Sequence, residues 1–172
     1  MRVAYAENDL AAGMLYLASY AFMLRVPSEA LPMIAGENAL VPLLPNTHSC
    51  ISVTEDELVL RLARRKNKPD GAIIRRSCCC EKSKHLCPVH VLGKWMKAQA
   101  TGNAPFAQFS ASFARSELKR RLAKIGIADA EQYVLHDMRR GHAQDLVESG
   151  CSLHQILKAG EWVSPAFLKY LD

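Results

Sequence analysis

The stretch "CISVTEDELVLRLARRKNKPDGAIIRRSC" (50–78) decides the fold class, because its pattern of apolar and polar residues differs from that of the segments around it. Apolar and polar residues alternate over 50–65, which is typical of β-strands with one buried face. Pro69, Asp70 and Gly71 then supply turn geometry, and "AIIRRSC" (72–78) completes a hairpin. We therefore expect a small antiparallel sheet with a basic tip near Lys66–Lys68.

The rest of the chain predicts helices. An apolar helix over Asn8–Leu24 begins at Asn8 or Asp9, and its apolar residues run round much of its surface, as in a buried helix. Capping residues, prolines and glycines place further helices after the hairpin, from Pro88 to Ala100, from Ser110 or Ser112 to Lys124, over Glu131–Glu148, over Ser152–Lys158 and from Ser164 onward. The predicted fold is a single domain over 1–172, mainly α with a small antiparallel sheet.

Charge is unevenly distributed. The net charge is +5, yet nine basic and only two acidic residues lie between Arg61 and Lys84, so the remainder carries a slight negative charge. A second basic group, from Arg115 to Lys124, lies on a predicted helix. Clustering of this kind favours a polyanionic partner such as nucleic acid. No apolar run is long enough to span a membrane and the N-terminus lacks the layout of a secretory signal, so we expect an intracellular protein.

Four of the six cysteines lie within ten residues, in "CCCEKSKHLCPVH" (78–90). Adjacent cysteines in an intracellular chain favour a metal or free thiols over disulfides. Three thiolates and one imidazole suit tetrahedral zinc, and the candidate ligands are Cys78, Cys80, Cys87 and His90. Cys79 or His85 is an alternative for one ligand. The competing interpretation is a set of reduced thiols that pack the base of the hairpin.

Three segments outside the hairpin carry residues suited to phosphate chemistry. His136 and Arg139, in "LHDMRRGHAQDL" (135–146), are three residues apart and share a helix face. Trp162 and Tyr170 lie in "GEWVSPAFLKYLD" (160–172), and Arg25 follows the first apolar helix. Each residue alone has an ordinary structural explanation, whether as a surface pair, a packed terminal aromatic or a salt bridge between Arg25 and Glu29.

In this order, however, "YLASYAFMLRVPSEALPM" (16–33), the basic hairpin and the two C-terminal phrases resemble the catalytic domain of tyrosine recombinases, the phage-integrase family. The resemblance is nearest to crypton-like recombinases of eukaryotic transposons, and it covers roughly Leu10 to Asp172. It implies the mainly α recombinase core and a nuclear location if the source is eukaryotic. It also implies site-specific cleavage and rejoining of DNA.

The resemblance also implies roles for individual residues. Arg25 and Arg139 match the two arginines that neutralise the scissile phosphate. Lys66 matches the hairpin lysine that protonates the leaving 5′-oxygen, with Lys68 as the competing assignment. The remaining catalytic positions are matched by the proton-transferring His136, by Trp162 at a position that holds His or Trp in the family, and by the nucleophile, Tyr170.

The implied reaction needs neither a metal ion at the phosphate nor ATP. Tyr170 would form a 3′-phosphotyrosine and release a 5′-hydroxyl, and the covalent link would retain the energy of the phosphodiester. Two arginines offer paired N–H donors to the non-bridging oxygens, where charge accumulates. Zinc, if bound, would have a structural role only.

The chain departs from the family pattern before its first helix. Recombinases usually carry an N-terminal core-binding domain, and nothing before Leu10 could form one. The expected partners are double-stranded DNA, further copies of the chain on that DNA, and a separate core-binding domain or chain. Two alternatives stay open at this point, a catalytically silent DNA-binding remnant and a zinc-braced interaction module.

Overall fold

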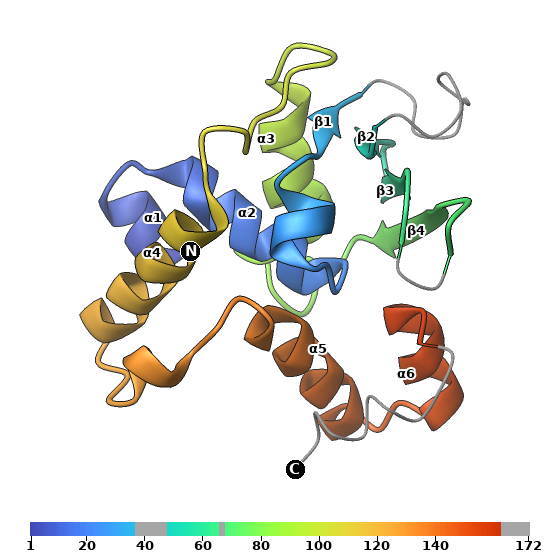
Figure 1. The fold of residues 1–172 in the computed structure, drawn as a ribbon. Coiled ribbons are helices and arrows are strands. Elements are labelled where there is room, and N and C mark those ends of the chain that lie inside the picture. Colours follow the sequence, from blue (N-terminus) through green and yellow to red (C-terminus); the bar gives the residue numbers. More distant parts are fainter. Residues whose placement is uncertain (37–47, 66–67, 163–172) are drawn as a thin grey trace.

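The structure, a computed structural model, describes residues 1–36, 48–65 and 68–162 (Figure 1). Over these residues the chain is mainly helical and carries one four-stranded sheet, in agreement with the predicted combination of helices and a small sheet. The predicted terminal helix from Ser164 lies outside the described residues.

The sheet has the strand order β1-β2-β3-β4, formed by Ile34–Ala35, Cys50–Val53, Glu57–Leu62 and Ala72–Ser77. Strands β2, β3 and β4 are antiparallel, with Leu60 opposite Ile74, and this confirms the predicted hairpin. The short strand β1, which the sequence did not indicate, pairs parallel with β2. The sheet is therefore mixed rather than purely antiparallel.

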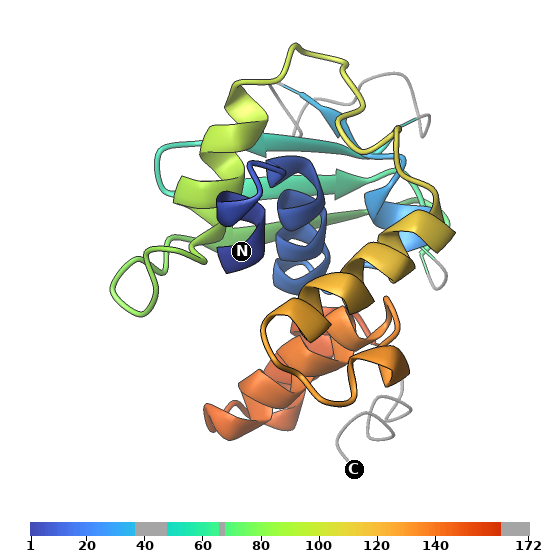
Figure 2. The ribbon, with the colours of Figure 1, turned by 90° about the vertical axis from the view of Figure 1, so that its left-hand side faces the viewer.

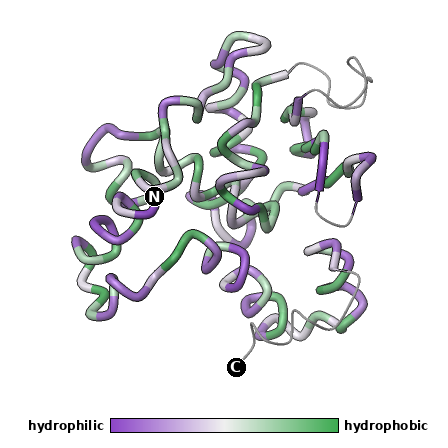
Figure 3. The backbone as a smooth tube through the Cα atoms, viewed as in Figure 1, coloured by the Kyte–Doolittle hydropathy of each residue, from purple (hydrophilic) through white to green (hydrophobic). Residues whose placement is uncertain are grey.

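One face of the sheet forms the main hydrophobic core. Leu58, Leu60 and Leu62 alternate along β3 and are all buried in this core, whereas Val59 packs with Cys50 in a small separate cluster. Helices α1 (Arg2–Ala6), α2 (Leu10–Ala21) and α3 (Lys94–Lys97) lie in front of the sheet in Figure 2. Figure 3 shows α2 as mostly hydrophobic, as expected for a central buried helix.

The end of α2 determines where the following residues lie. Met23 has φ 53°, in the left-handed region that non-glycine residues seldom adopt. This conformation reverses the chain before Arg25 and leaves the Met23 carbonyl available to Arg65 of the hairpin, at 3.1 Å. A π-helical turn, η1 (Val26–Ala30), follows directly, with Pro27 in its first turn.

The second half of the chain continues with η2 (Pro88–Gly93), which runs into α3, and with α4 (Ala111–Lys124). The Ser110 hydroxyl accepts a hydrogen bond from the Phe113 backbone N–H at 3.1 Å, which confirms Ser110 over Ser112 as the cap of α4. Helix α6 (Leu153–Gly160) begins at Ser152, which forms a capping box with Gln155.

The predicted helix over Glu131–Glu148 is wrong in its first part. Residues Ala130–Gln132 form a short 3-10 turn, η3, and helix α5 spans Asp137–Glu148. The Asp137 carboxylate accepts a hydrogen bond from the Val134 backbone N–H at 2.8 Å, which fixes an extended loop before the helix. His136 consequently lies at the N-cap of α5 rather than inside a helix.

Candidate functional site

Four of the six predicted catalytic residues lie within the described part of the chain: Arg25, His136, Arg139 and Trp162. The other two, Lys66 and Tyr170, lie outside the described residues. The four come from three elements, the turn before η1, the start of α5 and the residues just after α6.

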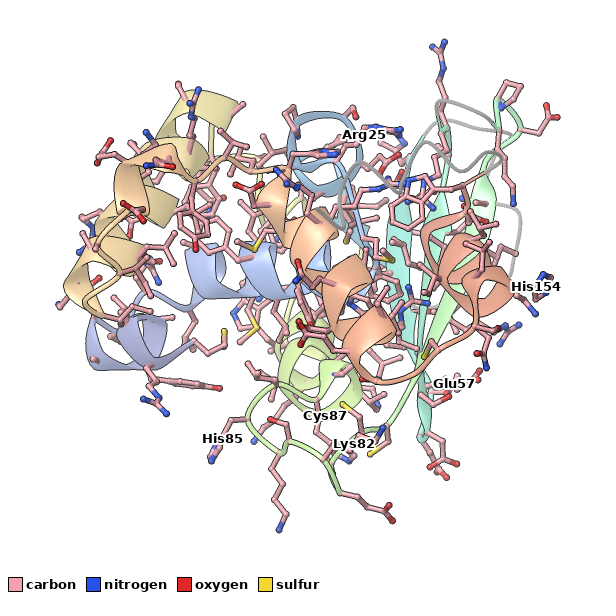
Figure 4. All side chains as sticks on the ribbon, turned by 90° about the horizontal axis from the view of Figure 1, so that it is seen from below. Arg25, Glu57, Lys82, His85, Cys87 and His154 are labelled. Carbon is pink, nitrogen blue, oxygen red and sulfur yellow. The ribbon has the colours of Figure 1, made fainter. Side chains whose placement is uncertain are left out.

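Arg25 is held in place by Glu29. The Glu29 carboxylate accepts hydrogen bonds from the Arg25 backbone N–H at 2.8 Å and from its Nη1 at 2.9 Å. Glu29 itself is 2% exposed, whereas the Arg25 side chain is partly open to solvent. The salt bridge between Arg25 and Glu29, considered as an ordinary structural explanation, is therefore present, and it leaves part of the guanidinium accessible (Figure 4).

His136 is half-buried and lines one cavity together with Arg25. Burial lowers the pKa of His136, and the positive charges of Arg139 and Arg25 lower it further. The three residues are thus close enough for their charges to interact, although Arg25 and His136 are far apart in the sequence. A lowered pKa keeps the imidazole neutral at pH 7, and a neutral imidazole can accept a proton.

Arg139 is almost completely buried, although its predicted role requires contact with a phosphate. Its side chain is 2% exposed, its Nη2 donates to the Gly160 carbonyl at 2.8 Å, and its guanidinium lies 4.7 Å from the centre of the Trp162 ring. The contact with Trp162 is a cation–π interaction. Trp162 therefore packs against Arg139 and covers it in this conformation.

A buried arginine that the sequence analysis did not single out connects these parts. Arg65, at the end of the hairpin strand, is 4% exposed. Its Nη1 donates to Glu161 at 2.7 Å, its Nε lies 3.3 Å from Glu29, and its Nη2 donates to the Met23 carbonyl. Arg65 thus joins the carboxylate that holds Arg25 to the residue that precedes Trp162.

Glu161 completes this network. It ends α6 in the left-handed conformation with φ 49°, and its second oxygen accepts from Lys68 at 2.7 Å. Burial alone would raise the pKa of Glu161, but the hydrogen bonds from Lys68 and Arg65 outweigh burial and lower it. Lys68, the alternative to Lys66 as the leaving-group acid, is thereby engaged with a carboxylate.

Arg76 of β4 makes a second connection between the sheet and the helices. Its Nε donates to the Ala21 carbonyl at 2.5 Å and its Nη2 to the Ala159 carbonyl at 3.2 Å. Burial and the nearby charge of Arg65 lower its pKa to about 10, so the side chain stays charged at pH 7. Arg76 therefore holds the ends of α2 and α6 against the hairpin.

The cysteine cluster forms a separate site at the base of the hairpin. The three sulfur atoms of Cys78, Cys80 and Cys87 lie 3.5, 3.1 and 3.5 Å from Nδ1 of His90, and the Sγ atoms of Cys78 and Cys87 are 3.8 Å apart. One ring nitrogen has a single proton or a single lone pair, so it cannot form three hydrogen bonds at once. Three sulfurs gathered around one nitrogen instead match ligands arranged around a cation.

Most of these distances are near those expected for zinc, although Cys80 Sγ lies closer to His90 Nδ1, at 3.1 Å. Bonds of about 2.3 Å to sulfur and about 2.0–2.1 Å to nitrogen at tetrahedral angles place neighbouring ligand atoms roughly 3.6–3.8 Å apart. The four ligand atoms all lie within 4.8 Å of one another, so the cluster could hold a metal such as zinc. These are the four predicted ligands, and neither Cys79 nor His85 belongs to the group.

The environment of the cluster also suits a metal. The Cys79 backbone N–H donates to Cys87 Sγ at 3.4 Å, as in the supporting shell of many thiolate sites. Burial opposes ionisation of Cys87, but this hydrogen bond and contacts with His90 outweigh burial and lower its pKa to about 6. Burial and its neighbours Cys78 and Cys87 raise the pKa of Cys80 to about 12. A dication at the centre would relieve the conflict between adjacent thiolates.

Comparison with known proteins adds no relative. No protein-family model and no curated protein matches the chain. Within the described parts of the chain, no helix combines the length and the hydropathy needed to cross a bilayer.

Proposed function

We propose that the chain is the catalytic domain of a tyrosine recombinase, which cuts and rejoins DNA through a 3′-phosphotyrosine at Tyr170. The observation that carries the proposal is the convergence of Arg25, His136 and Arg139. Three cationic or proton-accepting groups from two distant segments interact through their charges, and this is the equipment that transesterification of a phosphodiester requires.

In the proposed reaction, the Tyr170 oxygen attacks the scissile phosphorus, and the bond to the 5′-oxygen breaks. His136, neutral at pH 7, accepts the phenolic proton or orders the phosphate, and Lys66 gives its proton to the leaving oxygen. Arg25 and Arg139 neutralise the charge on the non-bridging oxygens. Attack of a 5′-hydroxyl on the phosphotyrosine reverses each step and needs no cofactor.

Trp162 and the ionic network have supporting roles in this proposal. Because Trp162 covers Arg139, a phosphate can reach that guanidinium only when the indole moves aside. Arg65 and Glu29 orient Arg25, and Glu161 holds the turn before Trp162. We infer that double-stranded DNA is the partner, with self-association on it and a separate core-binding domain or chain.

The experiment that tests the proposal is covalent capture. The purified chain is incubated with fragmented genomic DNA from the source organism, denatured, and recovered with any linked DNA. We expect an adduct that Tyr170→Phe abolishes and that Tyr5→Phe, a change at an exposed tyrosine of α1, leaves intact. An adduct that persists in Tyr170→Phe would refute the assigned nucleophile.

The burial of Arg139 favours a second candidate, a DNA-binding protein that no longer cleaves. If Trp162 stays over Arg139 when DNA is bound, the second arginine never reaches the phosphate. Salt-sensitive DNA binding without any Tyr170-dependent adduct would support this candidate over the recombinase.

We further propose that the cysteine cluster holds structural zinc. Cys78 directly follows β4 and His90 lies in η2, so the ion would fix the end of the hairpin to a helix that packs on the core. No step of the proposed reaction passes through this ion. Elemental analysis of the purified chain tests the site, and absence of zinc from protein prepared under reducing conditions would exclude it.

A further inference from the structure

A cavity of about 510 Å³ lies beside Arg25 and His136 and extends toward helix α4. Its polar lining comes from Arg25 and Ser28 around η1, from Ser112 and Arg115 on the first turns of α4, and from His136. The remaining wall is apolar and includes Val26, Pro27 and Leu135. No carboxylate lines it, but Arg25 is already paired with Glu29, so Arg115 is the arginine of the lining to consider further.

Arg115 differs from the other basic residues of α4. Lys119 pairs with Glu131, Arg120 with Glu7 and Glu117, Arg121 with Asp9 and Glu117, and Lys124 with Glu7. Most of the basic group that the sequence placed on this helix is therefore neutralised by carboxylates. Arg115, by contrast, makes no ion pair or hydrogen bond with any side chain in the described ranges, and it faces the cavity.

This distribution of charge indicates what the cavity binds. A guanidinium that has no side-chain partner among the described residues, and that lines a cavity with a second arginine, is suited to an anion with several oxygen acceptors, such as a phosphate. The volume exceeds what a single phosphate group needs, and the apolar wall offers a surface for the sugar attached to it. The lining therefore suits a phosphate within a nucleotide chain better than an isolated ion.

We propose that the cavity binds a backbone phosphate of the cleaved DNA strand, the phosphate adjacent to the scissile one. Arg115 is its charged ligand. Arg25 and His136 form the wall shared with the reacting phosphate, so one strand would pass from the catalytic residues to α4 without leaving the basic surface. Ser28 and Ser112 supply hydroxyl donors, and the deoxyribose lies on the apolar wall. This inference rests on the proposed function, since it names a further part of the same DNA substrate.

The test measures how DNA affinity depends on salt. Each neutralised phosphate contributes about 0.9 to the slope of log K against log salt concentration for duplex DNA. We expect Arg115→Gln to weaken binding of a short mixed-sequence duplex and to lower this slope by about 0.9, whereas Arg115→Lys keeps most of the slope. Arg120→Gln removes an arginine from the same helix, but one already paired with Glu7 and Glu117, and should leave the slope unchanged.

A second variant distinguishes weaker binding caused by a changed cavity from weaker binding caused by unfolding. Ser112→Asp places a negative charge on the wall of the cavity, yet an acidic residue in the first turn favours the helix. We expect this variant to melt at or above the wild-type temperature and to bind the duplex more weakly than Arg115→Gln does. Wild-type affinity in Ser112→Asp, or an unchanged salt slope in Arg115→Gln, would overturn the cavity as a phosphate site.

The result separates failure of this inference from failure of the proposed function. If a Tyr170-dependent adduct forms but the Arg115→Gln slope equals that of the wild type, the recombinase proposal stands and the cavity assignment is wrong. If no adduct forms but the slope falls by about 0.9, the cavity is a DNA-phosphate site on a protein that does not cleave. Binding that is absent, or that does not vary with salt, would overturn the cavity assignment and the DNA partner together.

Discussion

The cysteine cluster and the arginine–histidine site are built in opposite ways, and they lie on opposite sides of the molecule in Figure 4, which labels Cys87 and Arg25. All four candidate metal ligands fall between Cys78 and His90, on the loop after β4 and the turn η2 that follows it. The other site draws Arg25, Arg65 and His136 from segments that meet only in the folded chain. The first site depends on local geometry, and the second depends on contacts of the hairpin with the ends of α2 and α6.

This difference determines what would disrupt each site. A zinc ion held as proposed would balance the charge of the three converging cysteine thiolates, so its removal should have a sharp effect that begins at the hairpin base. A site held by a buried ionic network shares its supports with the core. Substitutions in that network should therefore lower the stability of the protein and also displace Arg25 and Trp162.

Removal of the proposed zinc should have the largest effect. Structural zinc contributes roughly 10–16 kcal/mol of binding free energy in small zinc peptides at neutral pH, and a chelator withdraws that contribution from the folded state. We expect chelation, or Cys87→Ser, to lower the melting temperature strongly and to increase hydrogen exchange at the hairpin base first. Cys79→Ser changes a cysteine of the same triplet that is not a ligand, and it should keep one zinc per chain.

Loss of Arg65 comes next and tests the other site. Arg65→Met removes the cation between Glu29, which is 2% exposed, and Glu161, which is 12% exposed. Leaving a buried charge without its partner costs about 3–5 kcal/mol, and we expect a loss of this size in urea denaturation at pH 7.

Arg75→Met is the matched control, because Arg75 pairs with Glu57 on the exposed surface of the same hairpin. An exposed pair contributes about 0–1 kcal/mol, so the control should unfold almost as the wild type does. Equal stability losses in the two variants would contradict the view that Arg65 organises the site.

A pH experiment sharpens the comparison further. Burial and the charge of Arg76 lower the pKa of His142, on the helix face toward Tyr20, to about 4. The unfolded chain takes up this proton near pH 6.5 and the folded chain only near pH 4, so stability should fall as the pH drops between these values. The loss is on the order of 3 kcal/mol at most.

His142→Leu should flatten that part of the stability profile, which calorimetry at a series of pH values would measure. His136 contributes a slope of the same sign, so the difference between wild type and variant isolates His142. His154→Leu, a change at an exposed histidine of α6 labelled in Figure 4, is the control and should follow the wild-type profile. A parallel profile for His142→Leu would show that the imidazole is not buried as described.

The sequence was most informative where structure depends on neighbouring residues. Alternation over 50–62 and the Pro-Asp-Gly turn predicted the hairpin, and Ser110 and Ser152 marked the starts of α4 and α6. The helix that ends at Glu148 was predicted to begin too early, because the hydrogen bond from the Val134 backbone N–H to Asp137, which fixes the loop before α5, leaves no periodic signal in the sequence. Strand β1 has two residues, too few for any periodicity to register.

The candidate sites show the same division. The spacing of Cys78, Cys80, Cys87 and His90 predicted a group that the structure brings together. Arg65 and Arg115 were each read as members of a basic run, because burial and carboxylate partners decide which arginine is structural and which remains available. Two of the carboxylates that pair with α4, those of Glu7 and Asp9, lie more than a hundred positions away in the sequence, and no local pattern could predict them.

The smallest expected effect concerns the cap of α6, the helix that leads into Glu161. The Ser152 hydroxyl accepts from the Gln155 backbone N–H at 3.4 Å, and the Gln155 side chain accepts from the Ser152 backbone N–H at 2.7 Å. Ser152→Ala should cost about 1 kcal/mol. Because α6 carries the Gly160 carbonyl that binds Arg139 and leads to the carboxylate that binds Arg65, fraying of α6 should raise hydrogen exchange around both arginines. Exchange at the cysteine cluster should stay unchanged, and an increase there instead would mean that the two sites are not independent.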